Sequence, residues 1–112
     1  GSIYRLMPEN NFARHVIGLN YCAIGVENVG GNDFPLTDAQ LLANEELVRY
    51  LTNKYSIKYL IGHYEYTLFK NSAIWKETDP NYQTIKDDPG ISFMQRIRFD
   101  LKDLNLKSAP NK

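Results

Sequence analysis

Four side chains that could take part in hydrolytic chemistry are spread along the sequence: Glu27, His63, Lys86 and Asp88. A histidine and a carboxylate are suitable zinc ligands, and a second carboxylate can accept a proton from metal-bound water. A lysine can stabilise the oxyanion that forms when water attacks a carbonyl. Because their spacing is less specific than a HExxH motif, these residue types suggest a hydrolytic site without establishing one.

Each of these residues also has an ordinary structural interpretation. Asp88 precedes a proline, a pattern typical of a helix N-cap, and Lys86 is by default a solvated surface amine. His63 follows a glycine and opens a loop, where it could line a site or simply lie at the surface. An ordinary structural role explains Glu27 less well. A carboxylate within a segment of small, apolar residues must be paired with a cation, solvated at the edge of a sheet or involved in function.

The second histidine and the single cysteine limit the ways in which a metal site could be built. His15 lies in the polar connection ARHVIGLN, and its residue type alone favours an ordinary exposed loop histidine. Cys22 has no cysteine partner, which rules out an internal disulfide. Any metal site must therefore be built from His, Asp and Glu side chains.

The overall composition predicts one domain, residues 1–112, with no global preference for a charged partner. Thirteen basic and thirteen acidic residues cancel, which argues against electrostatic attraction to nucleic acid or to anionic membranes. No apolar run is long enough to span a bilayer and no signal-like segment opens the chain, so we expect a soluble protein. Specificity for a binding partner must then come from a local binding site and not from the net charge.

Three short segments that could position these residues have strand-like patterns. Residues 2–8 alternate and stop at a proline, and residues 21–29 are rich in β-branched and small side chains and precede two glycines. Residues 57–63 form a compact apolar segment that would deliver His63 to the C-terminal end of a strand. In the second of these strands Glu27 would lie on the face opposite the bulky side chains.

Two further segments have helical patterns. Residues 36–55 begin with Thr37 and Gln40 at capping-box spacing and continue with apolar residues on one side. Residues 88–104 carry a second apolar stripe at helical spacing. The long connection of residues 64–85 is aromatic-rich and irregular. Strands and helices in this order predict an α/β fold in which a sheet packs against helices.

Several motifs, in the right order, resemble the zinc-dependent N-acetylmuramoyl-L-alanine amidase family, which shares its fold with the peptidoglycan recognition proteins. SIYRLMPENNFARH resembles the family's strand and its loop with a characteristic histidine. AIGVENVGG resembles its I-G-I-E strand, LTDAQ the start of its helix, YLIGHYEY its G-H motif and KDDPG its K-x-D-P-G motif. The resemblance covers nearly the whole chain and implies a mixed central β-sheet flanked by helices, without its N-terminal strand.

Carried over position by position, the resemblance implies a role for each matching residue. His63 and Asp88 would be zinc ligands, Glu27 the catalytic glutamate, Lys86 the transition-state lysine and His15 a residue beside the substrate. The implied reaction is hydrolysis of the amide that joins the lactyl group of N-acetylmuramic acid to L-alanine in peptidoglycan. Zinc would activate a water molecule, Glu27 would take its proton, and Lys86 would contribute roughly 3 kcal/mol to oxyanion stabilisation.

Two departures from the family pattern matter. The connection of residues 64–85 is longer than usual, and its aromatic side chains, Trp75 among them, form either a self-packed lid or a wall that binds sugar rings or stem peptide. The family's first zinc histidine lies upstream of the motif at residues 2–8, so two ligands remain where catalytic zinc sites use three. We therefore expect an N-terminally truncated chain whose third ligand is supplied upstream, with His15 as a less favoured substitute.

Two alternatives to an active hydrolase stay open, a non-catalytic peptidoglycan-binding or muropeptide-binding module and an inactive amidase fragment. The resemblance implies a bacterial cell-envelope protein, secreted or periplasmic in preference to cytoplasmic. Intact wall and soluble muropeptides are both candidate substrates, and neither nucleic acid nor a membrane is an expected partner. The absent strand would expose a sheet edge, through which a homo-oligomer could form.

Overall fold

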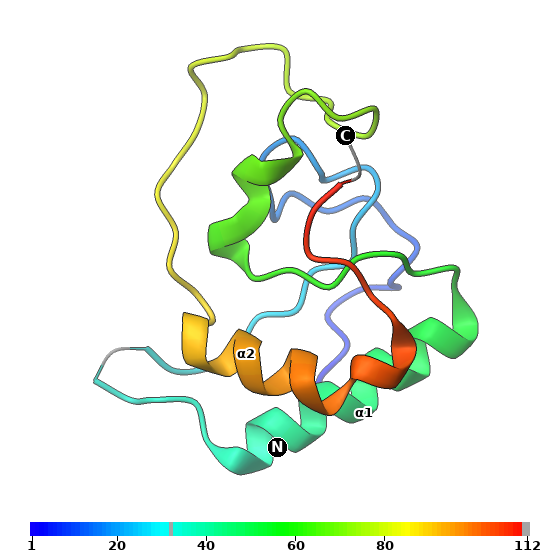
Figure 1. Cartoon of the computed structure of the whole chain (residues 1–112), viewed down its shortest axis with the longest axis vertical. Coiled ribbons are helices and arrows are strands. Elements are labelled where there is room, and N and C mark those ends of the chain that lie inside the picture. The colour runs from blue at the N-terminus through cyan, green and yellow to red at the C-terminus, as the bar shows by residue number, and fades with distance from the viewer. Residues whose placement is uncertain (32, 111–112) are drawn as a thin grey trace.

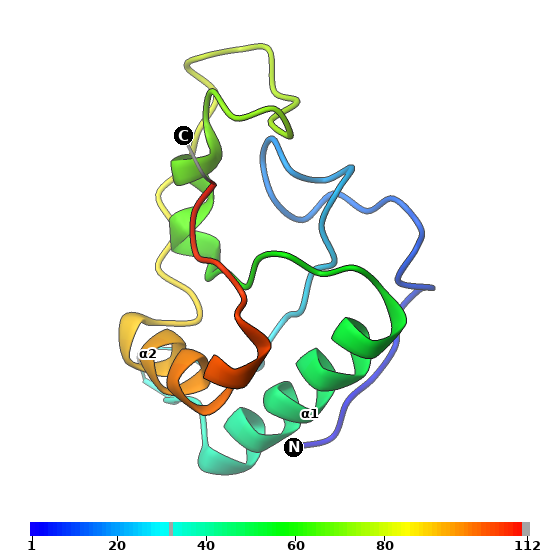
Figure 2. The same cartoon turned by 45° about the vertical axis from the view of Figure 1, so that its right-hand side comes forward.

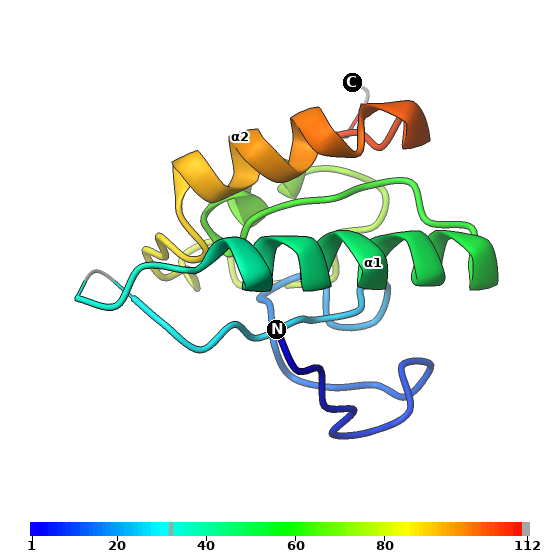
Figure 3. The ribbon, with the colours of Figure 1, turned by 90° about the horizontal axis from the view of Figure 1, so that it is seen from below.

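The computed structural model of the chain describes residues 1–31 and 33–110. Its helices, in chain order, are α1 (Asp38–Lys54), the 3-10 helix η1 (His63–Phe69), α2 (Ile91–Asp100) and the 3-10 helix η2 (Lys102–Leu104). The two α-helices pack against each other (Figure 1). Helix α1 lies between α2 and the irregular N-terminal segment (Figure 3). Within the described residues, no helix is long and apolar enough to cross a membrane.

The expected β-sheet is absent from the residues that the structure describes. Residues 1–31 and 33–110 contain no strand, so the prediction of an α/β fold with a mixed central β-sheet was wrong. A sheet requires neighbouring segments to exchange backbone hydrogen bonds in register, and the segments expected as strands do not pair with one another. The β-type pairing described is an isolated parallel bridge between Tyr59 and Lys107. Figure 2 shows the C-terminal segment beside the connection from α1 to η1 that carries this bridge.

Side chains, in place of a neighbouring strand, contact the backbone of residues 21–29. Nε2 of Gln40 donates a hydrogen bond to the carbonyl oxygen of Val29 at 2.7 Å. Nε2 of His15 lies 3.1 Å from the carbonyl oxygen of Ala23. Because the described residues form no sheet, they offer no sheet edge for the expected route to a homo-oligomer.

The first α-helix begins where the sequence predicts. The amide of Gln40 donates to Oγ1 of Thr37 at 3.1 Å, and the amide of Thr37 donates to Oε1 of Gln40 at 2.8 Å. This reciprocal capping box satisfies two amides at the start of the helix. Leu41 and Leu51 are buried on the apolar side that the spacing predicts.

The second α-helix is shorter than predicted and begins later. Its N-cap is Gly90, with a φ of 100°, a backbone conformation that glycine adopts without a Cβ penalty. Asp88 therefore lies ahead of the helix and does not cap it, which overturns the ordinary structural interpretation of this residue. Its carboxylate is available for a contact elsewhere.

Two hydrophobic clusters make up the core, and residues 59–61 run between them. The first cluster contains Leu41, Met94, Ile97 and Leu101, and the second contains Leu19, Tyr66 and Phe69. Leu60 packs against the first cluster, whereas Tyr59 and Ile61 pack against the second. Since alternate side chains of an extended backbone point to opposite sides, this short segment contributes to both clusters and ends just before His63.

Candidate functional site

His63 and Asp88, the two predicted zinc ligands within the chain, lie together. Nδ1 of His63 is 3.4 Å from Oδ2 of Asp88. His63 is the first residue of η1, which follows Gly62, and Asp88 ends the extended segment that leads to α2. The side chain of His63 is 26% exposed and that of Asp88 is 55% exposed, so a ligand can reach both.

His15, the residue predicted beside the substrate, is partly buried. Its ring rests against Gly25, where an added Cβ would come within 2.9 Å of the imidazole. Burial lowers the pKa of His15, the hydrogen bond with Ala23 opposes this shift, and the charge of His63 lowers the pKa further. The predicted place of His15 beside the substrate stays a prediction.

The described residues supply fewer metal ligands than a catalytic zinc site uses. In residues 1–31 and 33–110, no group of three or more His, Cys, Asp or Glu side chains is arranged to hold a metal ion. Three protein ligands are typical of catalytic zinc, so a zinc site that used His63 and Asp88 would need one ligand more. His15, the substitute ligand, is bonded to the backbone of Ala23 and does not join the pair.

Glu27 and Lys86 are exposed. The contacts described for His63 and Asp88 include neither of them. The structure thus brings together the two predicted metal ligands and leaves the two predicted catalytic side chains at the surface, where their roles stay predictions.

Trp75 packs inside the long connection. Its ring stacks on that of Tyr66, with centroids 6.2 Å apart and planes inclined by 11°. It also lies against Gly18, where an added Cβ would come within 2.5 Å of the indole. Tyr66 and Phe69 are each only 1% exposed. The first part of the connection therefore packs on itself, as one of the two alternatives predicts, while residues 78–88 are exposed. A substrate contact by Trp75 stays a prediction.

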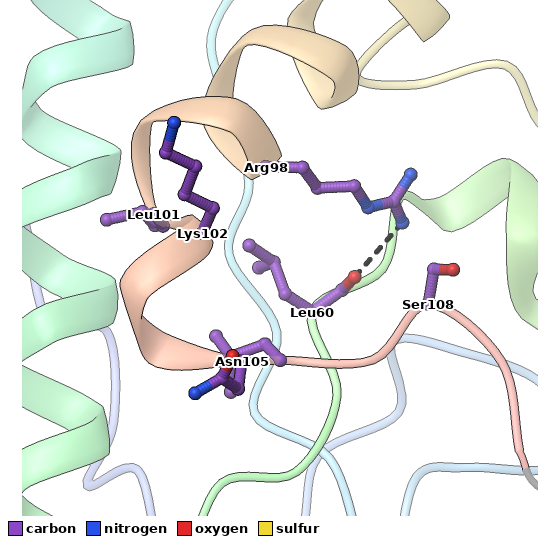
Figure 4. Close-up of a pocket in the computed structure, with 7 residues that line it drawn as sticks. Leu60, Arg98, Leu101, Lys102, Asn105 and Ser108 are labelled. Atoms are coloured by element: carbon purple, nitrogen blue, oxygen red, sulfur yellow. Dashed lines mark hydrogen bonds between the residues drawn. The ribbon is translucent and has the colours of Figure 1, made fainter.

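A set of contacts that was not predicted from the sequence supports the backbone around His63. Nη2 of Arg98, on α2, donates to the carbonyl oxygen of Leu60 at 3.0 Å and pairs with the carboxylate of Glu65 (Figure 4 shows the Leu60 contact). The same Glu65 oxygen accepts the amide of Gly62 at 2.8 Å. A glutamate three residues after a helix N-cap is a recognisable signal, whereas its pairing with Arg98 has no local signature.

A cavity of about 350 Å³ lies beside Arg98 and apart from the His63–Asp88 pair. Its lining is Leu60, Arg98, Leu101, Lys102, Asn105, Leu106 and Ser108 (Figure 4). Three of these residues belong to α2, to η2 or to the residue between them. None of the residues predicted to act in catalysis, metal binding or substrate binding lines this cavity.

Comparison with known proteins identifies the family. No curated protein and no solved structure matches the chain significantly. The family model described as N-acetylmuramoyl-L-alanine amidase matches residues 1–91 of the 112. The matched range contains the His63–Asp88 pair, Glu27, Lys86 and His15, and it ends at the first residue of α2. The chain therefore belongs to the N-acetylmuramoyl-L-alanine amidase family.

Proposed function

We propose that the protein hydrolyses the amide between the lactyl group of N-acetylmuramic acid and L-alanine in peptidoglycan. Membership of the family supports a peptidoglycan amidase function in general terms. The observation that carries the more specific proposal is the approach of His63 to Asp88 at 3.4 Å, with both side chains open to solvent. An imidazole and a carboxylate at this separation provide two donors of the kind that hydrolytic zinc sites use.

Zinc is the cofactor that we propose for this site, with His63 and Asp88 as two of its protein ligands. When bound, zinc would polarise the scissile carbonyl and lower the pKa of a water molecule to about 7. Because catalytic zinc sites typically use three protein ligands, a third ligand is required beside these two.

The remaining roles fall to side chains of this chain that are exposed or partly buried. Glu27 would accept a proton at its carboxylate and return it to the leaving amine. Lys86 would donate a hydrogen bond to the developing oxyanion. His15 would contact the substrate beside the His63–Asp88 pair, and the partly buried Trp75 would contact the sugar or stem peptide.

Mass spectrometry of muropeptides incubated with the protein, with and without added zinc, tests the proposal. The expected products are the free stem peptide with L-alanine at its amino end and the peptide-free sugar. His63→Ala and Asp88→Ala should lose both turnover and zinc, whereas Asp87→Ala, at the exposed neighbouring carboxylate, should keep both. Glu27→Ala should abolish turnover and leave zinc content intact. Cleavage at another bond, or full turnover in His63→Ala, would contradict the proposal.

A non-catalytic muropeptide-binding module is the second candidate function. It is favoured by one observation, that the described residues arrange no group of three metal ligands. Saturable binding of muropeptides in the absence of zinc, with no product formed when zinc is added, would support this candidate over the hydrolase. Because peptidoglycan surrounds the bacterial cell, we place either function in the cell envelope.

A further inference from the structure

We infer that Tyr66 is a positioning residue for this site, and that its hydroxyl fixes the segment carrying Lys86 and Asp88 relative to η1, which carries His63. The inference rests on the proposed function. The hydroxyl oxygen of Tyr66 lies 2.7 Å from the carbonyl oxygen of Thr84 and 2.7 Å from the amide nitrogen of Thr84. One hydroxyl therefore donates to the carbonyl and accepts from the amide of the same residue.

The ring of Tyr66 is held firmly enough to direct this hydroxyl. Tyr66 is 1% exposed. Its ring centroid is 5.8 Å from that of His63, and its ring stacks on that of Trp75 with centroids 6.2 Å apart. Because the ring cannot shift without disturbing these neighbours, the direction of the hydroxyl is fixed, and it determines where the backbone of Thr84 lies.

The segment that follows Thr84 has few other restraints. Residues 78–88 are exposed, and they descend as an extended connection towards the start of α2 (Figure 1). Before Thr84, Nζ of Lys70 donates to the carbonyl oxygen of Pro80 and to Oε1 of Gln83. From Thr84 onwards, the described contacts are those of Thr84 with Tyr66 and the pair of Asp88 with His63. Lys86 lies between these two points. Since a segment with few buried contacts opens locally at little cost, the Tyr66 hydroxyl limits the range of positions open to Lys86 and Asp88.

A role in packing alone makes a different prediction. If Tyr66 only filled the second hydrophobic cluster, phenylalanine would replace it without consequence for the exposed segment. The Tyr66→Phe variant keeps the ring and removes both hydrogen bonds to Thr84, so it separates positioning from packing.

Amide hydrogen exchange of the purified protein gives the first test and does not depend on any activity. In Tyr66→Phe the amide of Thr84 should exchange about tenfold faster, because its acceptor is lost, whereas the amide of Leu51 in α1 should be unchanged. Tyr59→Phe is the matched control, since Tyr59 packs edge-on against Phe69 in the same cluster. Unchanged exchange at Thr84 would overturn the inference, whatever the protein hydrolyses.

Turnover of muropeptides gives the second test. Tyr66→Phe should lower kcat about tenfold with little change in KM, because a small misplacement of a catalytic group slows the reaction. In a Lys86→Ala background the same substitution should have a smaller effect on kcat, since one of the two residues that it positions has been removed. Losses that multiply in the double variant would overturn the positioning role. Absence of muropeptide hydrolysis in the wild-type protein would instead contradict the proposed function, and the exchange result would still decide whether Tyr66 orders the segment.

Discussion

Arg98 on α2 and Glu65 on η1 form an ion pair that braces the backbone on both sides of Gly62. Their side chains are 28% and 12% exposed, so the pair is largely shielded from solvent. The family match ends at Ile91, and Arg98 therefore lies outside the matched residues although it supports the segment that presents His63. Helix α2 thus contributes to the site without supplying any of its predicted reactive groups.

Arg98→Ala should lower the free energy of unfolding by about 2 kcal/mol, because it removes hydrogen bonds from a charged donor to Leu60 and Glu65. Urea denaturation followed by circular dichroism measures this loss. Arg96→Ala is a matched control on the same helix, where the partner Asp38 is 83% exposed, and its loss should stay below about 1 kcal/mol. If the two variants lost equal amounts of unfolding free energy, the ion pair of Arg98 with Glu65 would contribute no more to stability than an exposed pair.

Glu45 should make stability fall as the pH rises. Its Oε2 is buried and has no hydrogen-bond partner within the described residues. Burial raises the pKa of Glu45 and neighbouring Asp100 raises it further, while Arg49 and Arg96 oppose the shift. A carboxyl whose pKa is raised by folding stabilises the protein fully below its unfolded pKa, and this contribution is lost as the pH rises through the folded pKa.

Glu45→Gln should therefore be more stable than the wild type at pH 7, and its advantage should shrink towards pH 4. The difference in the free energy of unfolding between the two proteins, measured by urea denaturation across this range, isolates Glu45 from other titrating groups. Glu46→Gln, at the exposed next position, should show no such pH-dependent difference. An advantage that grows towards pH 4 would reverse the assigned sign.

Glu9 should have the opposite dependence. Its carboxylate lies 2.7 Å from Nζ of Lys54 and 3.1 Å from Nε of Arg5, which links the N-terminal segment to the end of α1. The hydrogen bond from Lys54 is the largest cause that lowers the pKa of Glu9, to about 2. A lowered pKa contributes stability above the unfolded value, and this stability is lost as the pH falls through the folded value.

Glu9→Gln should be less stable than the wild type at pH 7, and the two proteins should converge between pH 4.5 and about 2. Thermal denaturation at closely spaced pH values measures this convergence. A difference that stays constant down to pH 2 would mean that the pairing with Lys54 does not persist in solution.

Lys86→Ala should reduce muropeptide turnover roughly 100-fold, which is the usual effect of removing one oxyanion donor. Zinc content should be unchanged, because the amine is not one of the proposed ligands. Steady-state kinetics and metal analysis on the same preparations check both points. Lys58→Ala, at an exposed lysine outside the site, is the control. Unaltered turnover in Lys86→Ala would remove this side chain from the mechanism.

The first helix shows which parts of the fold local sequence can predict. Thr37 and Gln40 satisfy each other within one turn, so their spacing alone identifies the start of α1. The predicted strands failed because pairing depends on a partner elsewhere in the chain. Around residues 59–61 the alternating pattern is real, but it reflects two hydrophobic clusters on opposite sides of one extended segment and not the two faces of a sheet.

In the candidate site, too, some features could be predicted from the sequence and others could not. Motif order led to His63 and Asp88, and the structure places them together. The hydrogen bonds between Tyr66 and Thr84 and the pair between Arg98 and Glu65 join residues that are distant in sequence. No local pattern marks such contacts, so only the folded arrangement shows how the ligands are supported.

The isolated bridge between Tyr59 and Lys107 makes the tail of the described chain part of the same cooperative unit as the residues leading to His63. Lys107 donates its amide to the carbonyl of Lys58 at 2.9 Å and accepts the amide of Leu60 at 3.0 Å. Proteolytic removal of the residues after η2 would remove both of these hydrogen bonds, so Lys58 and Leu60 would lose their backbone partner Lys107. The C-terminal segment therefore restrains residues 58–60, which lie between the two clusters. Its removal would loosen the backbone that leads to His63, although the contacts described for Lys107 include neither His63 nor Asp88.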